Sequence, residues 1–331
     1  MLQRFQRMAF AAAAAWMASA AAAAAEISGE IGIGQSEPGQ LDLQTPATQV
    51  ARQVADLHHF MLVIITGVTI FVLALLLIVV LRYNRLANKT PARWTHNTLV
   101  EVVWTAGPVV ILLLIAFPSV KLLQLQEDFS QVAPDLVIKA TGNQWYWTHE
   151  YTEHGVEFDS TMIGYGEPVL NAAVREELAE YGYPDRAFKL ATDTAVVVPV
   201  NKTVLVQVTA ADVIHSWTVP AFGVKADGVP GRVNQTWFNA EKQGVYFGQC
   251  SELCGKDHSF MPITVKVVSQ PVYDAWLACA KENDIVDCPA PTMLEFLEAK
   301  EAQEAIAAAE AAREADIASA ADAAPSVETV R

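Results

Sequence analysis

Five residues whose side chains bind soft metals gather in two short stretches of this chain. Cys250, Cys254, His258 and Met261 lie within a span of twelve residues, and His215 lies upstream of them. Thiolates combined with imidazoles bind copper or zinc rather than calcium or magnesium. Two cysteines beside two histidines also suit tetrahedral zinc, whereas a thioether ligand is typical of copper sites. The set of five therefore favours copper.

Each of these residues has a simpler explanation when it is taken alone. The two cysteines would form a disulfide in an oxidising compartment, the histidines would be ordinary polar residues, and Met261 would fill the core. The occurrence of all five at this spacing, just before Pro262 opens an expected strand, favours the metal site. Cys279 and Cys288 lie outside the motif, and for them we expect a disulfide in the tail, with free thiols as the alternative.

The elements that must position these ligands are short strands. After residue 134 the chain has β-branched and aromatic runs separated by turn residues, which predicts a β-sandwich or barrel. The expected strands cover residues 135–140, 144–151, 195–200, 203–210, 235–239, 244–248 and 263–268. In blue-copper folds, ligands from one loop and one distant strand meet at an end of such a sandwich.

Other segments surround the expected strand domain, which covers residues 121–270. A more helical, charged insertion at residues 166–190 is expected on the surface. The tail at 271–331 is rich in Ala and Glu from residue 294 to 324, so we expect a solvated or partly disordered helix there.

The N-terminal half contains membrane and export signals. Residues 1–25 combine a basic start with an alanine-rich stretch, which predicts a cleaved signal peptide, and a periplasmic segment at 26–59 follows. Two uncharged apolar runs, 60–81 and 102–120, are each about long enough to span a bilayer as a helix. The connector at 82–101 carries several basic residues, so we expect it in the cytoplasm and both flanks in the periplasm. Gly107 and Pro108 predict a bend in the second run.

The charge of the chain limits the class of partner. The formal net charge is −15 at pH 7, and acidic residues dominate from Glu127 onward. An acidic surface repels nucleic acid and would attract a basic protein partner, although excess acid also serves solubility alone. We therefore expect no nucleic-acid partner.

The ligand spacing resembles a known motif. Cys250, Cys254, His258 and Met261, with His215 upstream, are similar to the binuclear CuA motif of cytochrome c oxidase subunit II. The resemblance extends to residues 142–147, 212–220 and 225–232, and the insertion resembles that of α-proteobacterial members. It implies a cupredoxin-like, mainly β domain on a two-helix transmembrane hairpin.

The resemblance also implies roles for the ligands. Cys250 and Cys254 would bridge two coppers and share the odd electron between them, so that each bond changes little on reduction. His215 and His258 would each bind one copper, with Met261 and the carbonyl of Glu252 as weak ligands. The side chain of Glu252 would bind a magnesium ion shared with subunit I.

Further implied roles concern partners. Trp145 would be the entry point for electrons from cytochrome c, and alternation along the expected strand would place it on the opposite side from Tyr146. The acidic residues that would dock the lysines of cytochrome c are Glu150, Asp159, Asp193 and Asp212. Glu101, at the cytoplasmic start of the second span, would lie at the mouth of a proton path into subunit I.

The expected function is therefore that of an oxidase subunit in a bacterial inner membrane, whose oxygen-reducing site lies in subunit I. A quinol oxidase subunit would lack the copper ligands, and a thioredoxin-like copper chaperone would alternate strands with helices. Nitrous oxide reductase carries a propeller domain for which this chain has no room. A CuA-type electron-transfer protein or copper shuttle without an oxidase partner remains the alternative.

Overall fold

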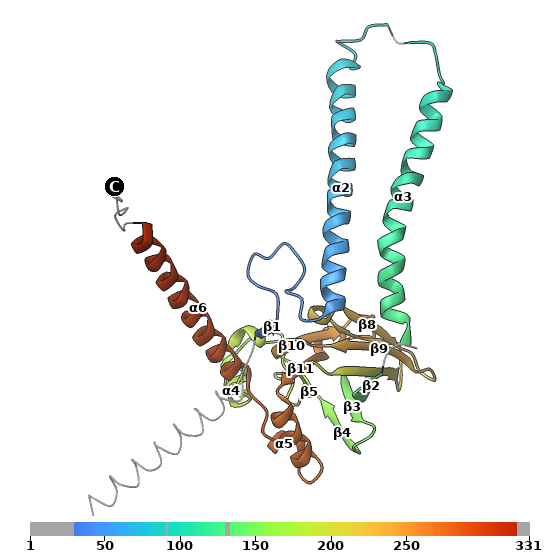
Figure 1. The fold of residues 1–331 in the computed structure, drawn as a ribbon. Helices are drawn as coiled ribbons and strands as arrows, with labels where there is room; N and C mark the ends of the chain where they lie inside the picture. Colours follow the sequence, from blue (N-terminus) through green and yellow to red (C-terminus); the bar gives the residue numbers. More distant parts are fainter. Residues whose placement is uncertain (1–29, 91, 130–132, 323–331) are drawn as a thin grey trace, which may run out of the picture.

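The computed structural model describes residues 30–90, 92–129 and 133–322. Within these ranges eleven strands form two facing sheets, and two long helices rise from one side of them (Figure 1). The predicted mainly β, cupredoxin-like sandwich on a helical hairpin is confirmed. The predicted signal peptide at 1–25 lies outside the described residues.

The first sheet carries the candidate metal ligands. Its strand order is β5 (Val196–Pro199), β11 (Pro262–Val268), β10 (Gln243–Cys250), β7 (His215–Val219) and β8 (Val224–Gly228). The N-terminal strand β1 (Ile31–Gly34) pairs in parallel with β10. His215 therefore begins β7 and Cys250 ends β10, and the register places Cys250 opposite Trp217. Adjacent strand ends thus hold ligands that lie 35 residues apart in sequence.

The second sheet completes the sandwich. Its order is β4 (Val156–Ser160), β3 (Tyr146–Tyr151), β2 (Leu136–Asn143), β6 (Thr203–Ala210) and β9 (Asn234–Asn239). Burial alternates along β2, β3, β4 and β6, so that apolar side chains of one face enter the core. Trp217 of the first sheet stacks on Phe238 of the second, with ring centroids 6.3 Å apart. Seven predicted strands are present, whereas β1, β4, β7 and β8 were not predicted.

The two helices are longer than the predicted spans. Helix α2 covers Gln49–Arg82 and α3 covers Thr98–Glu127, and both contain an apolar window with no buried residue. Lipid would cover these outward apolar side chains, as expected of a transmembrane hairpin. Helix α3 continues through both Pro108 and Pro118, so neither proline ends it.

Both helices are attached to the strand domain at the ends that lie next to the sheets, the start of α2 and the end of α3. Thr48 caps α2 by accepting a hydrogen bond from the Ala51 amide (3.0 Å), and its hydroxyl donates to the carbonyl of Phe222 (2.8 Å). At the end of α3, Trp237 donates to the carbonyl of Leu125 (3.3 Å). These contacts fix the sandwich relative to the membrane helices.

The predicted surface insertion is an integral layer of the domain. It contains α4 (Ala172–Glu180), whose Val174 and Leu178 are buried in the main core. Tyr183 of the same segment packs against Phe247 of β10, with ring centroids 6.2 Å apart. The segment is helical and largely exposed, as expected, but Val174 and Leu178 attach it to the core of the domain.

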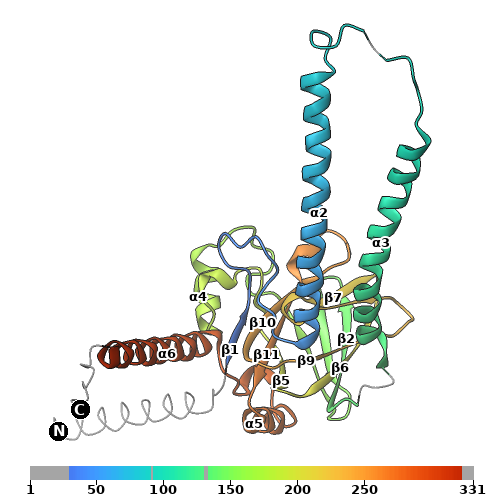
Figure 2. The same cartoon turned by 45° about the horizontal axis from the view of Figure 1, so that its top comes forward.

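The C-terminal segment begins packed on the domain and then leaves it. Helix α5 (Gln270–Ala280) is joined to the following loop by the Cys279–Cys288 disulfide, which confirms that prediction. Helix α6 (Met293–Asp322) buries Met293 and Phe296 and then extends away from the sandwich (Figure 2). The part of the chain that the structure describes also contains four short 3₁₀ helices: Asp185–Ala187, Pro220–Phe222, His258–Phe260 and Ile285–Asp287.

A neutral histidine lies inside the sandwich and makes its stability depend on pH. His149 of β3 is buried; its Nδ1 lies 3.1 Å from the Ser160 hydroxyl, and Trp217 donates to its Nε2 (3.4 Å). Burial lowers the pKa of His149 to about 3. At pH values between about 3 and the ordinary pKa near 6.5, His149 binds a proton in the unfolded chain but not in the folded chain.

We therefore expect the free energy of unfolding of the metal-free chain to fall as the pH drops below about 6.5. The contribution of His149 would approach about 1.4 kcal/mol per pH unit. Denaturant titrations at several pH values should show a smaller slope in His149→Gln than in the wild type. His154→Gln, in the turn between β3 and β4, is the control and should keep the slope; an unchanged slope in His149→Gln would contradict this role.

Candidate metal centre

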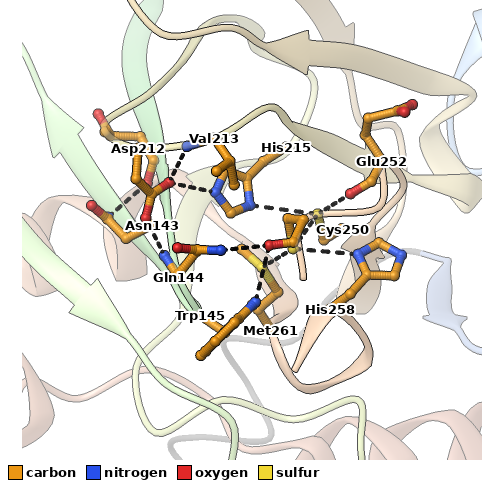
Figure 3. Close-up of polar contacts among 12 residues, drawn as sticks. Asn143, Gln144, Trp145, Asp212, Val213, His215, Cys250, Glu252, His258 and Met261 are labelled. Carbon is orange, nitrogen blue, oxygen red and sulfur yellow. Dashed lines mark hydrogen bonds and ion pairs between the residues drawn. The ribbon is translucent and has the colours of Figure 1, made fainter. Parts of the chain in front are cut away.

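The predicted ligands converge at one end of the first sheet (Figure 3). The Cys250 and Cys254 sulfurs lie 3.9 Å apart, too far for a disulfide. His215 Nδ1 lies 3.8 Å from the Cys250 sulfur, and His258 Nδ1 lies 3.4 Å from the Cys254 sulfur. The Met261 sulfur is 3.5 Å from that of Cys254, and the carbonyl of Glu252 is 3.3 Å from that of Cys250. Each imidazole thus faces a different thiol.

The donors occupy a nearly dry site. His215, Cys250, Cys254 and Met261 are all buried, and both cysteines are free. Among the described residues, His215, Cys250 and Cys254 form the group whose ligand atoms lie within 4.8 Å of one another. Two thiols, two imidazoles and a thioether are soft and borderline donors, a set that fits copper.

The two thiols cannot easily ionise together without a cation. Burial is the largest influence and raises the pKa of Cys250, but the hydrogen bonds with His215, His258 and the backbone of Glu252 and Ser216 together outweigh it, and the pKa is lowered to about 7. Burial and then the neighbouring Cys250 raise the pKa of Cys254 to about 12. Metal binding would deprotonate both, because bound cations reverse such shifts.

A carboxylate orients the first imidazole. The Nε2 atom of His215 lies 2.9 Å from Asp212 Oδ1, so the other ring nitrogen, Nδ1, faces Cys250. Asp212 is itself held by the backbone amides of Val213 (2.6 Å) and Gln144 (2.8 Å). A carboxylate behind a histidine ligand fixes both its tautomer and its ring orientation.

Strands β2 and β3 support the site from the second sheet. The indole of Trp147 donates to the carbonyl of Met261 (3.2 Å), and its ring lies 5.9 Å from that of His215. Gly142 leaves room for that imidazole, since a Cβ at this position would lie 2.7 Å from His215 Cδ2. Sequence reasoning gave Gly142 and Trp147 no role at the metal, although both lie in the segment that carried the resemblance.

Trp145 connects the ligand loop to the protein surface. Its indole donates to the carbonyl of Cys254 (3.3 Å), and Gln144 donates to the same oxygen (2.7 Å). Gly255, at φ +124°, permits this approach, because a Cβ there would lie 3.1 Å from the Trp145 ring. Strand β3 begins only at Tyr146, so the argument from strand alternation is wrong, and these contacts position the half-buried ring instead.

The side chain of Glu252 points away from the sulfur atoms (Figure 3). Only its carbonyl faces Cys250, and its side chain is exposed. Its carboxylate is therefore accessible to a group from outside the chain.

The four predicted docking acids occupy different environments. Glu150 of β3 pairs with Lys139 (3.0 Å), and Asp159 of β4 accepts from the Thr148 hydroxyl (2.6 Å) on the same outer face of the second sheet. Asp193 accepts instead from the backbone amides of Thr161 (2.8 Å) and Thr194 (2.7 Å).

Asp193 is half-buried, and burial raises its pKa. Asp212 lies beside His215 at the metal site. The resemblance that grouped these four acids therefore did not distinguish the two on the outer face from the two that form local hydrogen bonds.

Glu101 lies far along the hairpin from the ligands. It occupies the first turn of α3, and its side chain is exposed. Asn97 caps this helix by accepting from the Val100 amide (3.1 Å). The role of Glu101 in a proton path stays a prediction.

Comparison with known proteins identifies related chains. Family models for cytochrome c oxidase subunit II match residues 136–268 (periplasmic domain) and 36–122 (transmembrane domain). Cytochrome c oxidase subunit 2 of Cereibacter sphaeroides is 52% identical over 273 residues, covering 81% of this chain and 89% of the relative. A probable cytochrome c oxidase subunit 2 of Rickettsia bellii is 43% identical over 242 residues, covering 73% and 84%.

A solved structure is also similar to part of the chain. The crystal structure of the periplasmic domain of subunit II of cytochrome oxidase (CoxB) of Bradyrhizobium japonicum is 47% identical, with a TM-score of 0.38. It covers 46% of this chain, and 96% of that domain is matched.

The geometry around Asp212 makes a testable prediction about metal binding. Asp212→Asn keeps the shape of the side chain but removes the charge that orients His215, so copper affinity should fall about tenfold. Copper titration of the full chain in detergent measures the change. Asp159→Asn, which removes a carboxylate from the outer face, is the matched control and should bind copper like the wild type. Equal affinity in both variants would remove Asp212 from this role.

Proposed function

This chain belongs to the cytochrome c oxidase subunit II family, whose members carry CuA, and we propose that it accepts electrons from a soluble cytochrome c. The electrons would pass to the haem of subunit I for the reduction of oxygen coupled to proton pumping. The observation that carries the proposal is the convergence of both thiols, both imidazoles and Met261 on one site, with the Trp145 indole bonded to the carbonyl of Cys254.

The chain's own residues hold the ligands still. Bound there, a binuclear copper centre would supply one-electron chemistry. His215 is fixed by Asp212, Met261 by Trp147, and the Cys254 carbonyl by Gln144 and Trp145. Ligands locked by hydrogen bonds on strand ends change little in geometry when charge changes, which favours fast electron transfer.

Trp145 is the proposed entry point for electrons. One edge of its ring contacts the ligand loop through the hydrogen bond to Cys254, while the residue remains partly exposed. An electron arriving at the exposed edge would thus be one hydrogen bond from the backbone of a metal ligand. In the described residues, no other tryptophan donates to a ligand of this loop except Trp147, which is buried.

The outer face of β3 and β4 is the proposed docking surface for a basic cytochrome c. Glu150 and Asp159 lie on it, and the register places Glu157 directly opposite Glu150. Acidic side chains on neighbouring strands would attract lysines and raise the rate of association. A contribution of Asp193 or Asp212 to docking would come in addition to their local hydrogen bonds.

The hairpin sets the proposed orientation in a bacterial inner membrane. Its basic connector would be cytoplasmic, and the sandwich would face the periplasm. Glu101 would then lie at the cytoplasmic end of α3, where a proton path into subunit I could begin. On the opposite side, the exposed carboxylate of Glu252 would bind magnesium together with subunit I.

Docking and electron entry can be separated in the assembled oxidase. Trp145→Phe leaves every charge in place and should slow electron transfer within the bound complex at all ionic strengths. Glu150→Gln should weaken association mainly at low salt, because screening acts over about 8 Å at physiological salt. Stopped-flow oxidation of reduced cytochrome c across a salt series distinguishes the two effects.

Trp94→Phe is the matched control, since this exposed tryptophan lies in the connector between the helices. It should change neither association nor transfer. The entry role of Trp145 would be contradicted by a variant that binds cytochrome c weakly yet transfers electrons at the normal rate once bound.

The magnesium role of Glu252 has a separate test. Glu252→Ala should disturb manganese substituted into the oxidase while leaving copper content unchanged, because only the Glu252 carbonyl faces Cys250. The manganese EPR signal measures the first effect and metal analysis the second. Glu167→Ala, in the insertion, serves as the control. An unaltered manganese signal in Glu252→Ala would exclude the role.

A further inference from the structure

The segment between β4 and β5, residues 161–195, contacts the copper ligand strand and loop at three points. We call it the bracing segment. The Tyr165 hydroxyl donates to Asp257 Oδ2 (3.0 Å), and the Lys189 ammonium lies 5.3 Å from the centroid of the Phe260 ring. Gln249 donates to the carbonyl of Lys189 (3.0 Å). Each contacted residue immediately precedes a ligand: His258, Met261 and Cys250 respectively.

The loop that carries these ligands has little structure of its own. Between Cys250 and Met261 it forms one 3₁₀ turn, with backbone bonds from Phe260 to Asp257 (2.8 Å) and from His258 to Gly255 (3.4 Å). Asp257 also faces Lys256 of the same loop, at 3.9 Å. A loop with so few internal bonds needs outside support to hold an imidazole and a thioether still.

The bracing segment is firmly attached to the domain. Ala187 and Ala191 are buried in the main core, and the Thr192 amide donates to the Thr264 hydroxyl (3.1 Å). Lys189 adopts φ +66°, a left-handed conformation that is costly for a residue with a Cβ. At this residue both the carbonyl and the ammonium contact the ligand region.

We propose that the bracing segment is a positioning device for the metal centre, and that Tyr165 and Lys189 hold the His258 loop in its ligating geometry. These two residues touch no ligand and act only through Asp257, Phe260 and Gln249. The inference rests on the proposed copper site. Loss of both side-chain contacts would let the loop open and release metal without unfolding the sandwich.

The test compares copper release from the full chain in detergent. Supporting residues behind metal ligands typically change affinity ten- to a hundredfold. We therefore expect the double variant Tyr165→Phe with Lys189→Met to lose copper to an excess of the chelator bicinchoninate about tenfold faster than the wild type. Its copper EPR spectrum should also broaden or shift, while the melting temperature of the metal-free chain stays unchanged.

Matched controls come from the same chain. Tyr181→Phe alters a tyrosine of the bracing segment that does not contact the loop, and Lys202→Met removes a lysine paired with Asp135 (3.0 Å). Both should release copper at the wild-type rate. The single variant Lys189→Arg keeps Tyr165 and a cation over the Phe260 ring. It should therefore release copper as slowly as the wild type.

The outcomes separate this inference from the proposed function. Wild-type release rates and spectra in the double variant and in Tyr165→Phe alone would overturn the brace while leaving the copper site intact. Equally fast release in the controls would also overturn it. A wild-type chain that binds no copper would instead overturn the proposed copper site, and the brace with it.

Discussion

Two buried sulfurs 3.9 Å apart impose the main physical constraint on this molecule. The pKa of Cys254 is raised to about 12 by burial and by its neighbour, so ionisation of both thiols together is costly unless a bound cation offsets their charges. Metal binding therefore has to offset the repulsion between two thiolates in a buried site. The surrounding structure must also hold the imidazoles, the thioether and the carbonyl close to the two sulfurs, because misplaced ligands would bind the metal more weakly.

The scaffold meets this constraint with several layers of support. Adjacent ends of β7 and β10 supply His215 and Cys250, and the second sheet contributes Trp147 behind Met261. The N-terminal cap of α2 and the end of α3 bond to the same sandwich, which fixes the centre relative to the membrane. Strand ends thus hold the candidate ligands His215 and Cys250, and the helices bond to the same sandwich. An electron-transfer site needs this arrangement because its geometry must change little when charge moves.

Sequence reasoning selected the candidate ligands that the structure brings together because residue type and spacing identify soft metal donors, and it found seven strands because β-branched runs are distinct. It missed β7, whose His215, Ser216 and Thr218 are polar, and β8, whose Lys225 and Asp227 are polar. It could not place Trp145, which lies in a turn set by long-range hydrogen bonds. Nor could it predict that residues 161–195 pack on the domain as a layer. Their contacts are with β10 and β11, which lie far away in the sequence.

Copper stoichiometry combined with EPR of the full chain tests the central claim most directly. The chain should be kept whole, because β1 pairs with β10 and the start of α2 packs on the sandwich. If Cys250 and Cys254 bridge a binuclear centre, the loaded chain will hold two coppers that share one unpaired electron. A single localised copper, or one zinc bound in preference to copper, would contradict the account.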